Sequence, residues 1–177
     1  LKKADEKVQD LEDERKYLLD TNSNIPSEIA RLRTGLATAL DRDAKELPFV
    51  GELIQVVPDE VKWTGPIERL LPDFSLTVVV PKKLAEDAES FLEINQLGEK
   101  ISFICPQSDR KNPKLHDYSV VAKLSLRPEI EKSRQAWLRS ELAERFPHIC
   151  REERDTEYHK TPFALTEEGL VKSDGVL

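Results

Sequence analysis

Residues that could bind a metal occur at two places in this sequence. His148 and Cys150 alternate in a short apolar stretch predicted as a strand, so their side chains would share one face. Imidazole and thiolate are zinc ligands, but a structural zinc site needs four ligands, and no C-x-x-C or H-x-x-x-H motif supplies the others. Asp41 and Asp43 follow a predicted helix without a third ligand nearby. We therefore expect an edge strand and a solvated turn at these two places, and no metal site.

The sequence carries none of the short motifs that mark common catalytic or nucleotide-binding sites. It has no G-x-x-x-x-G-K-[ST] or G-x-G-x-x-G cradle for phosphates and no G-x-S-x-G nucleophile elbow. Glu52 and Glu68 could form a carboxylate pair, but on strand and helix surfaces we expect them to be solvated or salt-bridged. Trp63 and Trp137 are interpreted as core anchors rather than platforms on which bases stack. An enzyme is therefore the least favoured class, and no cofactor is expected.

Charge is unevenly distributed along the 177 residues. The net charge of −7 argues against nonspecific binding of nucleic acid by bulk electrostatics. Residues 100–127, however, contain six basic side chains and only two acidic ones. This segment and a preceding lysine pair therefore provide candidate contacts to DNA phosphates. The candidate DNA contacts are Lys82, Lys83, Arg110, Lys111, Lys114, Lys123 and Arg127.

The first residue and the cysteines bear on the origin of the chain. It begins at Leu1 and contains no methionine, which predicts a fragment of a longer protein; a processed mature chain is the alternative. Cys105 and Cys150 are too few for a disulfide framework and lie in apolar neighbourhoods, as reduced thiols of a cytosolic protein do. The sequence contains no run of about 18 apolar residues, the length that a membrane-spanning helix needs. We expect a cytoplasmic location and no membrane partner.

Residues 1–24 carry a heptad pattern. Apolar side chains recur at positions a and d among Lys, Asp, Glu and Gln, as expected for the end of a coiled-coil arm. A solitary amphipathic surface helix is the alternative. Residues 25–46 are then predicted to form a connecting helix, with Pro26 in its first turn and apolar residues at three- and four-residue spacing. The seam of the predicted coiled coil is Leu1, Ala4, Val8, Leu11 and Leu18.

The remaining residues, 47–177, alternate between strand-like and helix-like patterns. A polar, basic stretch at residues 106–117 predicts a loop among them. The order of elements indicates a compact two-layer α/β (α+β) domain with a mixed sheet. The predicted strands are residues 52–57, 75–80, 101–105, 119–126 and 148–150. The predicted helices are residues 66–71, 82–97 and 129–146, with a turn at 58–60 and mixed helix and loop at 155–165.

Part of this domain resembles the start of an SMC hinge. Residues 51–56 read as a Gly-led strand, Trp63 follows, residues 67–71 read as a helix with an acidic residue and leucines, and residues 76–81 read as a valine-rich strand. Closer still, the chain resembles the hinge of the SMC-like, MukB-like ATPases of the Wadjet JetC, MksB and EptC family. Three further segments carry this resemblance: residues 47–56, the set Trp137, Leu138, Glu141, Leu142, Arg145, Phe146 and Cys150, and residues 164–172.

The resemblance implies a hinge that homodimerises and so joins two coiled-coil arms at their tips. It also implies a parent ATPase whose heads lie outside these residues, within a DNA loop-extruding, anti-plasmid defence complex. Kleisin, winged-helix and Toprim nuclease subunits would bind the parent protein elsewhere, and DNA would be bound through the full complex. The parent would then be associated with the nucleoid or with plasmids. The hinge itself would be non-catalytic.

Strand edges are the predicted dimer contacts, because an unpaired edge can continue a sheet across a two-fold axis. A standard specific interface buries on the order of 1,600 Å² in total. The alternative function is a DNA-contacting module that uses the basic residues 100–127, and the two roles can coexist. The candidate interface residues are Val120, Ala122, Leu124, His148, Ile149 and Cys150.

Overall fold

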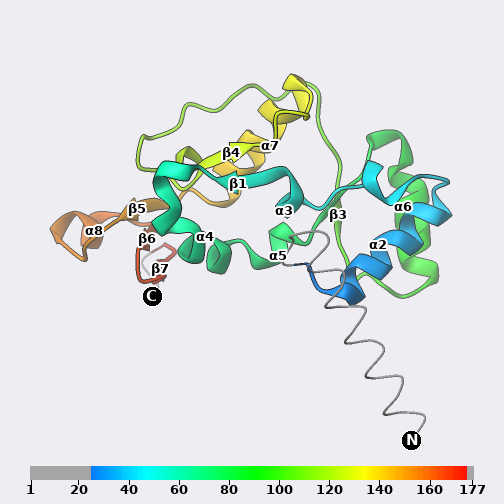
Figure 1. Cartoon of the computed structure of the whole chain (residues 1–177), viewed down its shortest axis with the longest axis horizontal. Coiled ribbons are helices and arrows are strands. Elements are labelled where there is room, and N and C mark those ends of the chain that lie inside the picture. The colour runs from blue at the N-terminus through cyan, green and yellow to red at the C-terminus, as the bar shows by residue number, and fades with distance from the viewer. Residues whose placement is uncertain (1–24, 175–177) are drawn as a thin grey trace, which may run out of the picture. The chain divides into compact units, whose positions relative to one another are not determined.

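The computed structural model describes residues 25–174 (Figure 1). The chain divides into two compact units: unit 1 comprises Leu1–Glu52 and Leu76–Cys105, and unit 2 comprises Leu53–Ser75 and Pro106–Leu177. Each unit is thus assembled from two stretches that are separated in the sequence. The predicted seam of Leu1, Ala4, Val8, Leu11 and Leu18 lies outside the described residues, so the coiled-coil arm stays a prediction.

Unit 1 combines two longer helices with a small sheet. β2 (Val78–Val79) pairs in parallel with β3 (Phe103–Ile104), and Val78 lies opposite Phe103. On its other side β2 meets Phe49 in an antiparallel bridge, so β2 is paired on both sides. The helical elements are α2 (Ser27–Ala39), η1 (Ala44–Glu46), α3 (Val50–Leu53), η3 (Lys82–Leu84) and α6 (Ala85–Ile94).

The core of unit 1 is apolar. Leu36 of α2 and Ala88 of α6 are fully buried, and the two helices contact one another. Apolar residues at three- and four-residue spacing give α2 the buried face that this contact needs. Val78 and Val80 supply the sheet side of the same cluster. Its buried members are Ile25, Ala30, Leu36, Ala37, Leu40, Leu47, Phe49, Val78, Val80, Ala88, Leu92 and Ile101.

Unit 2 is built from many short elements and one long helix. On that helix, α7, Trp137, Leu138 and Leu142 are buried. The helical elements of unit 2 are η2 (Pro58–Trp63), α4 (Thr64–Leu70), α5 (Pro72–Ser75), η4 (Val121–Lys123), α7 (Lys132–Arg145) and α8 (Thr156–Lys160). Its strands are β1 (Ile54–Val56), β4 (Leu124–Leu126), β5 (Ile149–Arg151), β6 (Ala164–Thr166) and β7 (Val171–Lys172).

The strands of unit 2 form two small sheets. β1 and β4 pair antiparallel, and β6 lies between a parallel β5 and an antiparallel β7. The outer side of β5 is also occupied, because the N–H of Cys150 donates to the carbonyl of Tyr118 at 2.7 Å and the N–H of Val120 donates to that of His148 at 3.0 Å. Among the described residues, β7 is therefore the edge of this sheet that remains without a backbone partner.

The mixed α/β class predicted from the sequence is confirmed, but the strand predicted at residues 52–57 begins as a helix. Residues up to Leu53 belong to α3, and only Ile54–Val56 are extended. The carboxylate of Glu52 accepts the N–H of Phe49 at 2.9 Å, as a glutamate at the third helical position does in a capping box, and this bond favours a helical start. The same carboxylate binds Nη1 of Arg33 at 2.6 Å.

The strand predicted at residues 119–126 is wrong in its first half. Residues Val121–Lys123 form the 3-10 turn η4, and only Leu124–Leu126 are a strand. The hydroxyl of Ser119 accepts the N–H of Ala122 at 3.1 Å, a side-chain bond that competes with strand geometry. The turn predicted at residues 58–60 likewise extends into a 3-10 helix that ends at Trp63.

Two strands near the end of the chain have no counterpart in the prediction. Residues 155–165 were expected to mix helix and loop, which α8 satisfies, but Ala164–Thr166 form β6 and Val171–Lys172 form β7. The strand predicted at residues 75–80 is only Val78–Val79 in the structure, and Ser75 belongs to the helix α5. The helix at residues 129–146 is confirmed as α7.

Candidate functional site

The candidate DNA contacts do not share one environment. Lys82 and Lys83 are exposed in η3 of unit 1, whereas the other five residues belong to unit 2. Within unit 2, Lys111, Lys114 and Arg127 are exposed and form no ion pair with any described residue. The two remaining residues are bound to carboxylates of the chain itself.

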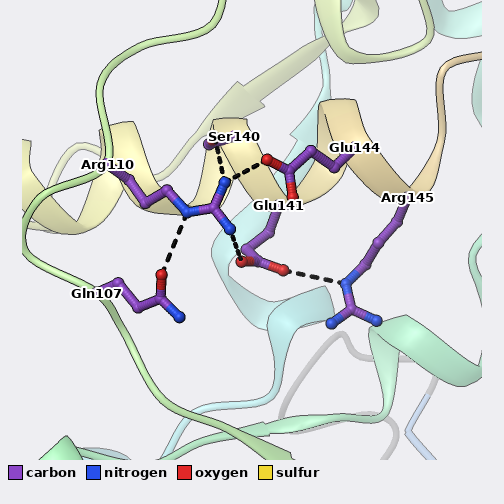
Figure 2. Close-up of polar contacts among 6 residues, drawn as sticks. All are labelled: Gln107, Arg110, Ser140, Glu141, Glu144 and Arg145. Carbon is purple, nitrogen blue, oxygen red and sulfur yellow. Dashed lines mark hydrogen bonds and ion pairs between the residues drawn. The ribbon is translucent and has the colours of Figure 1, made fainter.

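Arg110 fastens the 106–117 loop to α7 (Figure 2). Its Nη1 forms an ion pair with the carboxylate of Glu144, its Nη2 lies 3.5 Å from Oε1 of Glu141, and its Nε donates to Oε1 of Gln107 at 3.2 Å. The hydrogen bond to Glu144 raises the pKa of the guanidinium above its usual value. Because these carboxylates already compensate its charge, Arg110 acts here as an anchor of the loop.

Glu141 sits between two arginines. It is only 7% exposed, and Nε of Arg145 donates to its Oε2 at 3.1 Å from the side opposite Arg110. The guanidinium of Arg145 also lies over the ring of Phe74, 4.9 Å from its centroid. A buried carboxylate needs such partners, because desolvation without them would be costly. This cluster of side chains links the 106–117 loop to helix α7 and helix α7 to helix α5.

Lys123 is buried rather than displayed. It is 9% exposed, its Nζ lies 2.6 Å from Oε1 of Glu60, and its ammonium lies 5.8 Å from the centroid of the Tyr118 ring. The sequence pattern predicted that Lys123 lies on a strand, in which successive side chains point to opposite faces. The η4 turn instead directs it to Glu60, and a phosphate would have to displace that carboxylate. Lys123 is thus unavailable for DNA as the chain is folded here.

The candidate dimer interface lies largely in the interior of unit 2. Val120, Leu124, His148 and Cys150 are buried, whereas Ala122 and Ile149 are half-buried. Burial raises the pKa of the Cys150 thiol to about 12, which keeps it protonated and unreactive. Since the outer side of β5 is also occupied, a dimer contact through this strand would require part of unit 2 to open. The interface through these residues stays a prediction.

Other acidic residues singled out in the sequence serve the fold locally. The carboxylate of Asp43 accepts the N–H of Lys45 at 2.8 Å and caps η1, while Glu52 is held by Arg33 as described above. In residues 25–174 no group of three or more His, Cys, Asp or Glu side chains is arranged to hold a metal ion. Within the same residues, no helix is both long and apolar enough to cross a bilayer.

Unit 2 contains a hollow of about 380 Å³ whose polar groups are mostly engaged. Glu60 binds Lys123, Glu152 forms an ion pair with Lys62, and Asp155 accepts the N–H of Tyr158 at 2.8 Å. With the Cys150 thiol protonated, the described lining offers no pairing of nucleophile and base. The lining residues are Glu60, Trp63, Tyr118, Lys123, Cys150, Arg151, Glu152, Glu153 and Asp155.

Several strands have one side without a partner strand among the described residues, and none of these sides was predicted from the sequence. In the two-stranded sheet, β1 and β4 each pair on one side only. β3 pairs with β2 on one side, so its other side has no backbone partner among the described residues, and the same holds for β7. The sequence pattern of a hairpin is visible before β7, because two apolar stretches flank Glu167, Glu168 and Gly169. In the structure this glycine has φ of +85°. A glycine at such a turn marks a hairpin.

Three solved structures share the fold of this chain. The hinge domain of the Pyrococcus furiosus SMC protein matches with a TM-score of 0.53 and 16% sequence identity, over 84% of this chain and 83% of that one. The Pyrococcus furiosus Smc hinge domain with an extended coiled coil matches with a TM-score of 0.51 and 20% identity, over 99% of this chain; the match spans 65% of that longer chain. An asymmetric dimer of the Geobacillus stearothermophilus SMC hinge domain matches with a TM-score of 0.52 and 16% identity, over 93% and 72% of the two chains.

No protein-family model and no curated protein sequence matches the chain. At 16 to 20% identity, the likeness to the solved structures is one of fold. The fold of this chain is that of SMC hinge domains.

Proposed function

We propose that this chain is the hinge of an SMC-like protein, a non-catalytic domain through which two copies associate and so join two coiled-coil arms. The observation that carries the proposal is the reciprocal likeness in fold, which extends over 84% of this chain and 83% of an SMC hinge domain. A related hinge domain that shares the fold forms an asymmetric dimer.

Strand edges that lack a partner among the described residues give self-association a physical basis. An unpaired edge exposes backbone N–H and C=O groups, and pairing with a strand of a second copy satisfies them. β3 belongs to unit 1 and β7 to unit 2, so each unit offers an unpaired edge among its described residues, and β1 and β4 of unit 2 also pair on one side only. A two-fold axis repeats every contact. Pairing of β3 of one copy with β7 of the other would therefore occur twice and close the dimer.

Light scattering coupled to gel filtration tests the association. At micromolar concentration we expect the mass of a dimer, about twice the 20.3 kDa of the chain. A mixture of two copies carrying different fluorophores should exchange subunits and develop energy transfer. A mass of one chain that does not increase with concentration would contradict the proposal for this chain on its own.

Disulfide trapping tests the edges. Cys105 follows β3 directly and is half-buried, so an engineered thiol on β7, through Val171→Cys, would lie near it if β3 of one copy pairs with β7 of the other. A disulfide forms only where the two Cα atoms come within about 7 Å. Mild oxidation should then give a covalent dimer. The matched control is the same variant with Cys105→Ser, which should remain a monomer under denaturing, non-reducing conditions.

The finer identity is also a proposal: a parent ATPase of the Wadjet JetC, MksB and EptC family, in the cytoplasm, that works with kleisin, winged-helix and Toprim nuclease subunits and binds DNA through the whole complex. Its support is the order of matching sequence segments from residues 47–56 to residues 164–172. The parent gene should encode heptad repeats on both sides of this chain and a P-loop far upstream. A gene without a second heptad region would remove the proposal.

A second candidate function is contact with DNA, which the exposed and unpaired Lys111, Lys114 and Arg127 favour. Fluorescence anisotropy with duplex DNA should then show binding that weakens steeply with salt, because each phosphate contact releases counterions. Replacing the three residues with glutamine should abolish the signal, whereas Lys123→Gln, at a buried and paired position, is the control. Undetectable binding at about 50 mM salt would remove this candidate.

A further inference from the structure

His148 is a buried histidine that directly precedes β5, and its ring contacts the residue that follows β7. The residue is 4% exposed, its Nε2 lies 3.0 Å from Oγ of Ser173, and its ring meets Phe163 edge-on with centroids 5.6 Å apart. Its Nδ1 is buried and has no hydrogen-bond partner among the described residues. One ring nitrogen thus reaches a residue just beyond β7, while the other faces an environment without an acceptor.

The end of β7 is held at two successive residues. Side chains of neighbouring strand residues point to opposite faces of the sheet. On one face, Nζ of Lys172 donates to the carbonyls of Tyr158 at 3.3 Å and His159 at 2.9 Å, which lie in the last turn of α8. On the other face, Ser173 meets His148. β7 spans only Val171–Lys172 and pairs with β6 at both residues, and these two side-chain contacts add to that pairing.

The two contacts respond differently to protons. Lys172 binds two backbone carbonyls, which do not titrate. The imidazole of His148 must gain a second N–H when it is protonated. The hydroxyl of Ser173 can accept from Nε2, but the new donor at Nδ1 would be buried without an acceptor, which is unfavourable.

We propose that the contact between His148 and Ser173 is a pH-dependent latch, closed when the imidazole is neutral and opened by its protonation. Opening exposes the ring to water and frees the side chain of Ser173, the residue that follows β7. In the proposed hinge a returning arm would follow this strand, so the latch would control the root of that arm. Only this last step rests on the proposed function.

The surroundings of the ring set the direction of the response. Its contacts come from Ser173 and Phe163, and no charged side chain among the described residues shifts its proton affinity. Lys172 points to α8, and the thiol of Cys150, two residues away, is neutral. Burial alone lowers the pKa of His148 below the 6.5 of a free imidazole. The latch therefore stabilises the closed strand above about pH 6.5, and this stabilisation is lost as the pH falls toward the lowered pKa.

Hydrogen exchange of the 177-residue chain, followed by NMR from pH 5 to 8, tests the latch. We expect the protection factor of the Lys172 amide, corrected for intrinsic exchange, to fall by up to about tenfold per pH unit below pH 6.5, as release linked to one proton requires. In His148→Gln, which keeps a neutral polar group, protection should not depend on pH. His159→Gln is the matched control, because His159 is exposed on α8 and its carbonyl contact to Lys172 is kept.

Ser173→Ala should lower protection at pH 8 toward the value that the parent chain reaches at low pH. A protection factor that is independent of pH in the parent chain, or one that stays equally pH-dependent in His148→Gln, would overturn the proposal. Where a variant does not fold, the parent chain suffices. The Cε1–Hε1 signal of His148 and the amide signal of Lys172 must then titrate with one midpoint, and two separate midpoints would contradict the latch. None of these results depends on dimer formation.

Discussion

The two units of this chain are both small α/β bodies, but their interiors differ in chemistry. Unit 1 buries one apolar cluster, and its only buried charged residue within residues 25–174 is Arg33, which binds Glu52. Unit 2 contains seven of the nine buried polar or charged residues of the described chain, so its interior depends on pairing. These seven are Ser119, Lys123, Ser140, Glu141, His148, Thr166 and Lys172.

The two units therefore differ in how many buried polar groups must be paired. Buried polar groups need hydrogen-bond partners, and in unit 2 several of these partners are side chains. In unit 2 the hydroxyl of Thr166 accepts the N–H of Leu170 at 3.0 Å, and the ammonium of Lys172 donates to two carbonyls at the end of α8. The stability of unit 1 should therefore depend mainly on apolar volume. The stability of unit 2 should depend on its paired charges, on salt and on pH.

The largest effect is expected from Leu36→Ala in unit 1. Leu36 is fully buried, and such truncations lower the free energy of unfolding by about 2–5 kcal/mol, with little dependence on salt. Urea denaturation followed by circular dichroism measures the loss. Both tryptophans, Trp63 and Trp137, belong to unit 2, so their fluorescence shows whether unit 2 unfolds separately. Leu32→Ala, at a half-buried position, is the control with a smaller loss, and a strongly salt-dependent loss in Leu36→Ala would contradict the comparison.

Glu60→Gln should have the next largest effect, in unit 2. It leaves the ammonium of Lys123 buried without a carboxylate, which lowers the free energy of unfolding by up to about 3 kcal/mol. Adding Lys123→Met to the same chain removes the uncompensated charge, so the double variant should recover much of the loss. The measurement is a double-mutant cycle in urea. Additive single effects would show that the pair is not coupled and would weaken the comparison.

Gly169→Ala should destabilise the β6–β7 hairpin by about 1–2 kcal/mol, the usual penalty of a left-handed backbone for a residue with Cβ. The added methyl group would also meet Nη1 of Arg69, which donates to the carbonyl of Glu168 at 3.0 Å. Thermal unfolding measures the change. Gly65→Ala in α4 is the control, because a Cβ there meets nothing within 4 Å, and it should stabilise the chain by about 0.5–1 kcal/mol. Equal effects at both glycines would contradict the role of the turn.

The smallest effect is expected from Lys62→Met. Lys62 bridges the carboxylates of Glu152 and Glu167, and these bonds raise its pKa while lowering that of Glu152. Since the pKa of Glu152 is lower in the folded chain, the stabilisation is present above the ordinary carboxyl range and lost as the pH falls below it. The difference in melting temperature should be small at neutral pH and vanish in high salt or acid. Lys160→Met, at an exposed pair with Glu157, is the control.

The sequence predicted the helices better than the strands. The apolar spacing of α6 and α7 is local and was visible in the sequence, and the class of mixed α/β fold followed from the order of elements. β2 and β7 are only two residues long, too short to give a period, and their strand geometry depends on partners distant in the sequence. The helical start at Glu52 and the turn after Ser119 depend on single side-chain bonds that periodicity does not report.

The candidate sites show the same division. The amino-acid sequence already showed which side chains are basic, that no phosphate-binding or nucleophile motif is present, and which segments resemble an SMC hinge. Folding established that Arg110 and Lys123 are bound by carboxylates, that Cys150 is an interior thiol, and that β3 and β7 each lack a partner strand on one side among the described residues. The reason is physical. Residue type and helical spacing are fixed along the chain, whereas the partner of a charge is chosen by folding, which brings Glu60 to Lys123 across 63 positions of sequence.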